Sequence, residues 1–403
     1  MEGGGMPVSF RPDGAAKVRR ARAEPDLCTR VQVVAYRSMK RSIIVACAFG
    51  AMASAFAQTN EELNLRAEEP YQGGWRLEDQ LRDAEMWRAL SEKSPGDQQA
   101  RYNWFVSSRN ASLARNQGEV PEADRKQLAT IASELKKEAP NSFEAHMAGF
   151  HLEFPARSAF VHLNAAASVA PDRAELLGPH MAKALLDGDD AALQRACKEI
   201  QERGGISSAL LDVASDLLLS VDPNGIVITN GEMDTYPALV KQRNFGVRKD
   251  VLVIDQRLLA DAAYRAHCWA RAKAVGSVPT DGVAFVRGLL DATTRPVFLA
   301  LSLDPTWAKA LENELYVTGI ALRYSHQRVD NIPQLEQRWK SMTRNMYAGP
   351  LTANYLLPGA VLLRHYRSVG DETNAAQMEH TVRGIAEAQH LTTRLYQLGI
   401  IAH

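Results

Sequence analysis

The sequence predicts an α/β fold joined to all-α segments: helical hairpins come first, a small parallel sheet follows, and a helical segment ends the chain. Apolar residues recur three and four apart from about residue 77 to 220, which is the period of a helix with one buried face. Short β-branched runs alternate with helical stretches over residues 221–330, and the helical period returns over 331–403. We therefore expect domains at 58–220, 221–330 and 331–403.

The composition is that of an ordinary globular protein. The 403 residues include 47 basic and 47 acidic side chains, with 46% hydrophobic and 23% charged residues. These values exclude a disordered chain, a collagen-like chain and a polytopic membrane protein. Residues 1–57 hold nine of the basic and four of the acidic side chains, so the remainder has 38 basic against 43 acidic and a net charge of −5. A mildly acidic body argues against a nucleic-acid partner.

A signal peptide is predicted from Met39 to Ala57. Lys40 and Arg41 give it a basic start, Ser42–Phe56 carries no charge, and small residues precede the expected cleavage after Ala57. The apolar run is shorter than the roughly 20 residues that a membrane-spanning helix needs. A buried core helix is the alternative. The mature chain is therefore expected in the periplasm or outside the cell, without a transmembrane segment.

Residues 1–38 are rich in Gly, Arg and Pro and show no sustained period. We interpret them as a misassigned start or a disordered extension. Cys47 follows a short apolar run that resembles a lipid-attachment box, which is a further alternative for the leader.

Removing the leader leaves two cysteines, Cys197 and Cys268. The sequence leaves open whether they form a disulfide or remain buried thiols, because it gives no distance between them. The sequence contains no CxxC pair and no ligand spacing of His with Cys. A zinc site or another metal site is therefore not expected.

Prolines followed by capping residues divide the first region into helices. The breaks are Ser94–Asp97, Ala139–Ser142 and Ala170–Arg173, and each closes one helix and starts the next. Pro140 and Pro171 lie 31 residues apart, close to the period of tetratricopeptide repeats. The region resembles such repeats in its helix pairs, without their Trp-Leu-Gly-Tyr signature. An ordinary helical domain is the alternative.

Four apolar runs predict the strands of a Rossmann-like unit: Ile226–Thr229, Val251–Ile254, Pro296–Leu301 and Gly319–Tyr324. Helices are expected between them at Pro237–Phe245, Leu258–Ala274 and Gly282–Leu290. Continuous apolar strands alternating with helices indicate a parallel sheet covered on both faces. No GxGxxG motif follows the first strand, so a dinucleotide is not supported and no cofactor is expected.

The C-terminal region is predicted to form helices at Gln334–Thr343, Leu351–Ser368, Glu372–Ala388 and Leu391–Leu398. Pro358 is expected to kink or divide the second of them, because proline lacks the N–H group of the helix ladder.

The densest polar cluster follows the first strand and supplies the candidate site. In open α/β sheets, ligands bind where such loops meet helix N-termini. Asp255 ends the second strand and is expected at the same edge of the sheet. The alternative is structural: Asp234 or Thr235 caps the next helix and Gly231 serves the turn. The candidate ligand-binding residues are Asn230, Gly231, Glu232, Asp234, Thr235 and Asp255.

The stretch from Ile228 to Leu259 resembles a segment of large bacterial membrane proteins related to protein O-mannosyltransferases. In that family a strand ends in a Thr-Asn-Gly-Asp-x-Asp-Thr-Tyr/Phe-Pro loop, and a helix and a Gly-x-Arg-x-Asp-Val motif follow. Thr229–Pro237 and Gly246–Val251 match these motifs, with Glu232 in place of the family's first loop acid. The resemblance implies the soluble extracytoplasmic domain of that family. It does not carry over glycosyl transfer, because the membrane-embedded catalytic part has no counterpart here.

These observations predict an exported, non-enzymatic binding or scaffold protein of the bacterial cell envelope, whose helical repeats bind a protein partner. One alternative is binding or processing of an envelope glycan or a nucleotide sugar through the 230–235 loop. Another is assistance to a separate membrane glycosyltransferase. No GxSxG, P-loop or HExxH motif is present, so no catalytic residue is assigned and an enzyme is not favoured.

Overall fold

The computed structural model describes residues 66–116, 118–203, 205–280 and 282–401. The predicted signal peptide and the extension before it lie outside these ranges. Within them, the chain combines helical segments with one small sheet, as an α/β plus all-α fold requires. No helix in the described ranges is long and apolar enough to cross a membrane.

The first region is a series of packed helices. Between the predicted breaks, α3 packs with α4 and α5 packs with α6, which agrees with the predicted hairpins. α2 packs with α3 across the first break, and α7 packs with α8. Asp97 and Ser142 lie at two of the predicted breaks, and each caps the helix that follows by accepting a backbone N–H bond. The elements are α2 Leu77–Lys93, α3 Gln98–Arg115, α4 Glu122–Glu138, α5 Phe143–Glu153, α6 Ala159–Val169, η2 Ala174–Leu176, α7 Leu177–Asp187, α8 Asp190–Glu202 and α9 Ser208–Leu219.

The sheet has five strands in the order β2-β1-β3-β5-β4. The strands are β1 Ile226–Thr229, β2 Leu252–Asp255, β3 Val297–Ala300, β4 Leu315–Val317 and β5 Ala321–Tyr324. The first three are parallel, with Ile226 opposite both Leu252 and Val297. β5 runs antiparallel to β3 and to β4. The sheet is therefore mixed, which corrects the expectation of a parallel sheet throughout.

The connection between β4 and β5 explains the mixed sheet. Only three residues, 318–320, join these strands, and a parallel crossover needs a dozen or more. β4 itself escaped the sequence analysis because it is three residues long and follows the acidic turn of η4 Glu312–Glu314.

The helices around the sheet follow the prediction with one correction. The helix expected over Leu258–Ala274 is divided, because Asp261 ends η3 and caps α11 through the backbone N–H of Tyr264. α10 packs on β2 and α12 on β3. The elements are α10 Thr235–Phe245, η3 Gln256–Ala260, α11 Ala262–Arg271, α12 Gly282–Ala292 and α13 Pro305–Ala310.

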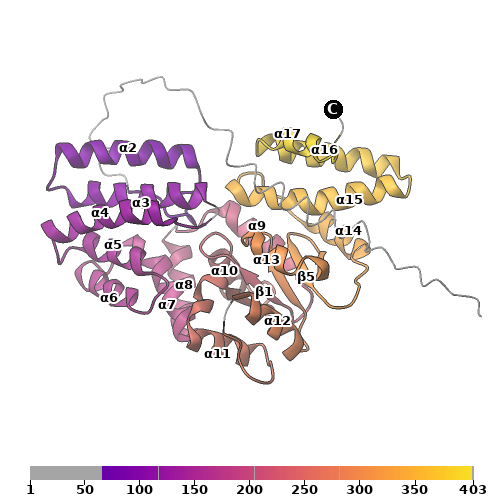
Figure 1. Cartoon of the computed structure of the whole chain (residues 1–403), viewed down its shortest axis with the longest axis horizontal. Coiled ribbons are helices and arrows are strands. Elements are labelled where there is room, and N and C mark those ends of the chain that lie inside the picture. Colours follow the sequence, from indigo (N-terminus) through magenta and orange to yellow (C-terminus); the bar gives the residue numbers. More distant parts are fainter. Residues whose placement is uncertain (1–65, 117, 204, 281, 402–403) are drawn as a thin grey trace, which may run out of the picture.

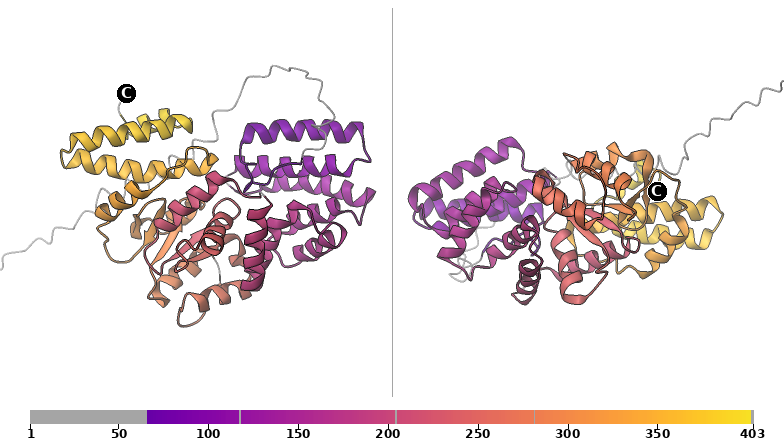
Figure 2. Two further views of the ribbon diagram at one scale, coloured as in Figure 1. Left: turned by 180° about the vertical axis from the view of Figure 1, so that it is seen from behind. Right: turned by 90° about the horizontal axis from the view of Figure 1, so that it is seen from below.

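The C-terminal helices pack as a further group. They comprise α14 Ile332–Ser341, η5 Gly349–Tyr355, α15 Leu356–Ser368, α16 Glu372–Ala388 and α17 Thr392–Gln397. Pro358 lies in the first turn of α15, where a missing N–H is tolerated. The helix predicted over Leu351–Ser368 is therefore divided just before Pro358, where η5 ends and α15 begins. In Figures 1 and 2, α2–α6 lie on one side of the α/β unit and α14–α17 lie on the other.

Cys197 and Cys268 are both buried free thiols, which settles the alternative in favour of unpaired cysteines. Burial raises the pKa of each thiol to about 12. Because the thiolate is the reactive form, both are expected to be chemically inert.

Candidate functional site

The candidate loop lies where the parallel strands end. β1 ends at Thr229, β2 ends beside it at Asp255, and Ser302 follows the end of β3. The loop of residues 230–234 leads from β1 into α10. The fold therefore brings all six predicted site residues to the carboxyl edge of the sheet. That they bind a ligand stays a prediction.

Asp234 folds back onto its own loop. Its carboxylate accepts the backbone N–H of Asn230 at 2.9 Å and the hydroxyl hydrogen bond of Ser302. It makes no side-chain cap of α10. Burial raises the pKa of Asp234, and the hydrogen bond from Ser302 opposes that shift. Asp234 thus fastens β1 to the segment after β3 and does not cap α10.

Thr235 and Gly231 complete this turn. The Thr235 hydroxyl lies 2.7 Å from that of Thr229 and accepts the backbone N–H of Gly231 at 3.0 Å. Gly231 has a φ of 100°, a conformation that glycine adopts readily. A Cβ there would lie 2.4 Å from Nε of Arg257. Glycine is therefore required at position 231 for two reasons: the backbone has a positive φ, and a side chain there would clash with the guanidinium group of Arg257.

Asn230 connects the loop to two neighbours. Its Nδ2 donates to the backbone oxygen of Ser302 at 2.9 Å, and its Oδ1 accepts from Gln256 Nε2 at 2.9 Å. These bonds tie together the ends of β1, β2 and β3.

Glu232 and Asp255 belong to a chain of buried charges. Arg109 of α3 donates to Glu232 Oε1 at 2.9 Å, and Arg257 lies 3.3 Å from the same oxygen. Arg257 also binds Asp255, whose side chain is fully buried, at 2.8 Å. The two arginines lower the pKa of Glu232 against the opposing effect of burial. Glu232 is thereby held as a carboxylate between the helical region and the α/β unit.

Glu69 lies next to this chain of charges, and its pKa is raised above the ordinary carboxyl value. Its Oε2 lies 3.6 Å from Nη1 of Arg109, and its Oε1 lies 3.9 Å from Nε2 of His151. Burial raises the pKa of Glu69 to about 8, although Arg109 opposes this rise. Burial also lowers the pKa of His151 to about 3, so this imidazole stays neutral. The positive charge of Arg109 is therefore balanced mainly by the carboxylate of Glu232.

The raised pKa of Glu69 predicts a pH-dependent stability. Between pH 4.5, the ordinary value of the carboxyl group, and about 8 the unfolded chain ionises while the folded chain keeps its proton. The protonated carboxyl group of Glu69 therefore contributes to the free energy of unfolding. This contribution is fully present below pH 4.5, falls between pH 4.5 and about 8, and is lost above pH 8. Replacing Glu69 by Gln is expected to remove the decline. Urea denaturation at pH 5.5 and 8 measures it; an equal decline in both proteins would contradict the assignment.

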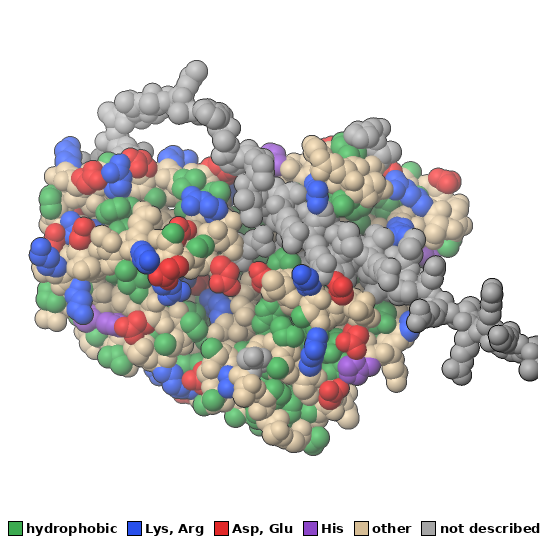
Figure 3. Space-filling model, in the orientation of Figure 1, with side chains coloured by type: hydrophobic (Ala, Val, Ile, Leu, Met, Phe, Trp, Pro, Cys, Tyr) green, Lys and Arg blue, Asp and Glu red, His purple; other side chains and the backbone are tan. Residues whose placement is uncertain are grey.

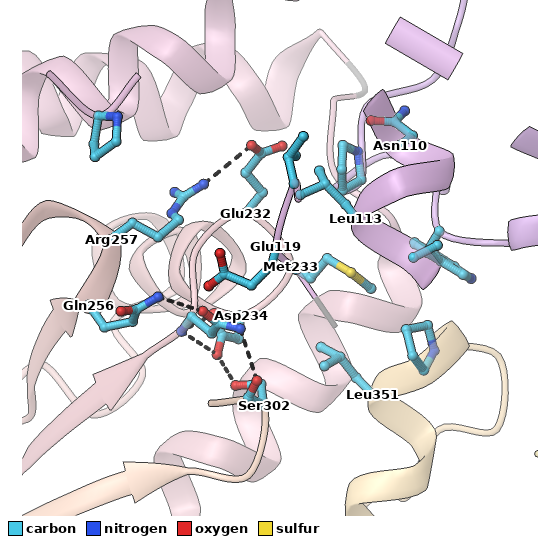
Figure 4. Close-up of a pocket in the computed structure, with 18 of the residues that line it drawn as sticks. Asn110, Leu113, Glu119, Glu232, Met233, Asp234, Gln256, Arg257, Ser302 and Leu351 are labelled. Carbon is cyan, nitrogen blue, oxygen red and sulfur yellow. Dashed lines mark hydrogen bonds and ion pairs between the residues drawn. The ribbon is translucent and has the colours of Figure 1, made fainter. Parts of the chain in front are cut away.

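A large pocket opens beside this charge chain. Its volume is about 690 Å³, within the roughly 300–1,000 Å³ that ligand sites occupy. The 230–234 loop and η3 form one part of its wall, α3 to α5 a second and η5 with α15 a third. Figure 4 shows Glu232, Met233 and Asp234 of the loop between Arg257 on one side and Leu113 and Leu351 on the other. All three regions of the fold thus contribute to one site.

Arg109, Arg257 and Glu69 are not among the site residues predicted from the sequence. Arg257 follows Asp255 by two residues, and that spacing could have suggested a local ion pair. Arg109 is 123 residues from Glu232, and Glu69 precedes α2. No local pattern connects either residue to the loop.

The fold and the site define a protein in which an α/β unit and two helical regions enclose one pocket. A family model described as TMEM260-associated domain 2 matches residues 210–282, from α9 to the start of α12. This segment contains the 230–234 loop and Asp255. The match fits loosely with the resemblance to proteins related to protein O-mannosyltransferases. No curated protein and no solved structure matches the chain.

Proposed function

We propose that this chain is an exported, non-enzymatic binding protein, and that a segment of a partner protein occupies the pocket at the junction of its three regions. The observation that carries this proposal is the pocket itself. It is the place where the helical region, the carboxyl edge of the sheet and the C-terminal helices meet. Pockets with largely apolar walls and a few placed polar groups are the usual form of binding sites.

The state of the acidic side chains favours binding over catalysis. A general acid or base has to exchange a proton with its substrate within hydrogen-bond reach. Asp255 is fully buried against Arg257, Asp234 is engaged by Asn230 and Ser302, and Glu232 is held by two arginines. These carboxylates are engaged in ion pairs and hydrogen bonds within the protein, so we assign none of them to proton transfer.

The helical region supports a protein as the partner. Arrays of helical hairpins commonly present an inner surface to protein segments, and here α3, α4 and α5 supply one wall of the pocket. On the face shown in Figure 3, acidic and basic side chains alternate over α2–α6. That pattern offers no single-sign field for nucleic acid.

A glycan is the second candidate, because Trp75 and Trp307 are half-buried in the pocket wall and could offer apolar faces to a ligand. The family match is also compatible with a role in which this chain assists a separate membrane glycosyltransferase. A nucleotide sugar would need cations for its phosphates. Arg109 and Arg257 are already paired with carboxylates, whereas Arg125 and Arg265 also line the pocket and donate to backbone oxygens.

Site-specific photo-crosslinking tests the proposal. Benzoylphenylalanine in place of Met233, inside the pocket, is expected to yield polypeptide adducts in the native host that map to one recurring segment. The matched control places the probe at Val161, which is 69% exposed on α6, and should not give that adduct. Adducts of sugar or lipid mass from position 233, or the same adduct from both positions, would contradict the proposal. Mass spectrometry of the mature N-terminus tests export in the same sample, with cleavage expected after Ala57.

A further inference from the structure

A second, much smaller cavity adjoins the pocket. Its volume is about 10 Å³, which is close to the least space that holds one water molecule. The side chains of Arg109, His151, Phe154 and Glu232 line both this cavity and the pocket. The other residues around it come from the segment before α2, from α5 and from the first turns of α7 and α10. The cavity therefore lies where the helical region meets the α/β unit.

Two buried oxygen atoms of the residues around this cavity have no hydrogen-bond partner among the described residues. They are Oε1 of Glu69 and the hydroxyl oxygen of Tyr71, and these residues are 3% and 1% exposed. The backbone N–H of Gly178 opposes the rise in the pKa of Tyr71 that burial causes, but a donor cannot accept the hydroxyl hydrogen. Buried polar groups nearly always have a partner, either in the protein or in an ordered water. The two oxygens thus indicate a polar ligand in the cavity.

A third polar atom lies close to Glu69 without bonding to it. Nε2 of His151 is 3.9 Å from Glu69 Oε1, whereas an N–H···O hydrogen bond spans about 2.7–3.2 Å. A water molecule commonly bridges polar atoms at such a separation. Burial lowers the pKa of His151 to about 3, so the neutral ring offers one donor and one acceptor. Water, which both donates and accepts, satisfies either arrangement.

The charges around the cavity favour a neutral ligand over an ion. Arg109 and Glu232 both line it and are paired with each other at 2.9 Å. Burial raises the pKa of Glu69 to about 8, so this carboxyl group adds little negative charge at neutral pH. A cation would lie beside the guanidinium group of Arg109, and an anion would lie beside the carboxylate of Glu232. Burying such an uncompensated charge is strongly unfavourable.

We infer that this cavity is a binding site for one ordered water molecule, which bridges Glu69 Oε1 and the Tyr71 hydroxyl group beside His151. The water supplies the hydrogen bonds that these buried groups lack, and it fastens the segment before α2 at the junction behind Arg109 and Glu232. This inference goes beyond the proposed function, because the site is a separate cavity and does not depend on what occupies the pocket.

A crystal structure of the mature chain, at a resolution that shows ordered water, tests this inference directly. We expect one peak of electron density at about 2.6–3.2 Å from both Glu69 Oε1 and the Tyr71 oxygen. A cavity without density, or a direct hydrogen bond between the two residues, would overturn the inference. Anomalous signal at this peak after crystals are soaked in rubidium or bromide salts would identify an ion and would overturn it as well.

A double-mutant cycle tests the same bridge in solution. Glu69→Leu and Tyr71→Phe each remove one partner of the water, so either change alone disrupts the bridge. The shift in the urea midpoint of the double variant is therefore expected to be smaller than the sum of the two single shifts. The control combines Glu69→Leu with Tyr355→Phe, because the Tyr355 hydroxyl belongs to a different cluster, around Asp216; these shifts should add. Additive shifts for the Glu69 and Tyr71 variants would contradict a shared water.

Discussion

Replacing Arg257 by Ala is expected to lower the free energy of unfolding by about 3–5 kcal/mol, because the change leaves buried carboxylates without their partner. Asp255 would lose the ion pair that it makes among the described residues, and Glu232 would keep its pair with Arg109. The guanidinium group also lies over the rings of Phe154 and Tyr236, at 5.2 and 5.5 Å. Urea denaturation at pH 7 measures the loss.

An exposed ion pair provides the control for this effect. Arg243 pairs with Asp190 on the surface, where Asp190 is 62% exposed. Arg243→Ala should lower stability by no more than about 1 kcal/mol, as exposed pairs do. A loss of similar size for the two variants would contradict the view that the charge chain at the pocket floor organises the junction.

Asp216→Ala is expected to destabilise the protein by about 3 kcal/mol or more, because it leaves three donors, among them the buried hydroxyl of Tyr355, without an acceptor. Asp216 lies in α9 and is 1% exposed. Its carboxylate accepts the backbone N–H groups of Thr343 and Arg344 at 3.0 and 2.9 Å and the hydroxyl of Tyr355 at 2.7 Å. It therefore ties the C-terminal helices, and with them one pocket wall, to the helix that precedes β1.

Two milder variants calibrate that result. Tyr355→Phe removes one of the three hydrogen bonds and is expected to cost about 1–2 kcal/mol. Asp212→Ala removes a half-exposed partner of Asn345 and should cost about 1 kcal/mol or less. Thermal and urea unfolding of all three variants provide the measurement. A loss for Asp216→Ala as small as that for Asp212→Ala would count against the described attachment.

Local pattern predicted most of the fold. Ile226–Thr229 is a strand with the predicted bounds, and Glu372–Ala388 is a helix with the predicted bounds, because each has a strong period between clear stop signals. β4 was missed because three residues carry no period. The mixed pairing followed from the tight β4–β5 connection, which a sequence reading of separate strands does not reveal.

The candidate site was predicted from the sequence, whereas the contacts within it are seen only in the structure. The 230–234 loop was found because polar residues followed an apolar strand. The pairing of Glu232 with Arg109 depends on the docking of α3 against the end of the sheet, and the engagement of Asp234 by Ser302 depends on the β1–β3 register. These are long-range consequences of packing, so local spacing could not show which acids remain available to a ligand.

Hydrogen–deuterium exchange of the mature protein, with and without a synthetic peptide of the segment that crosslinks at position 233, tests the central claim most directly. We expect slower exchange in three separate segments that share only the pocket: the 231–235 turn, the α3 end near Leu113 and η5 around Leu351. Protection confined to the outer surface of α6, or no protection in the 231–235 turn, would show that the pocket is not the binding site.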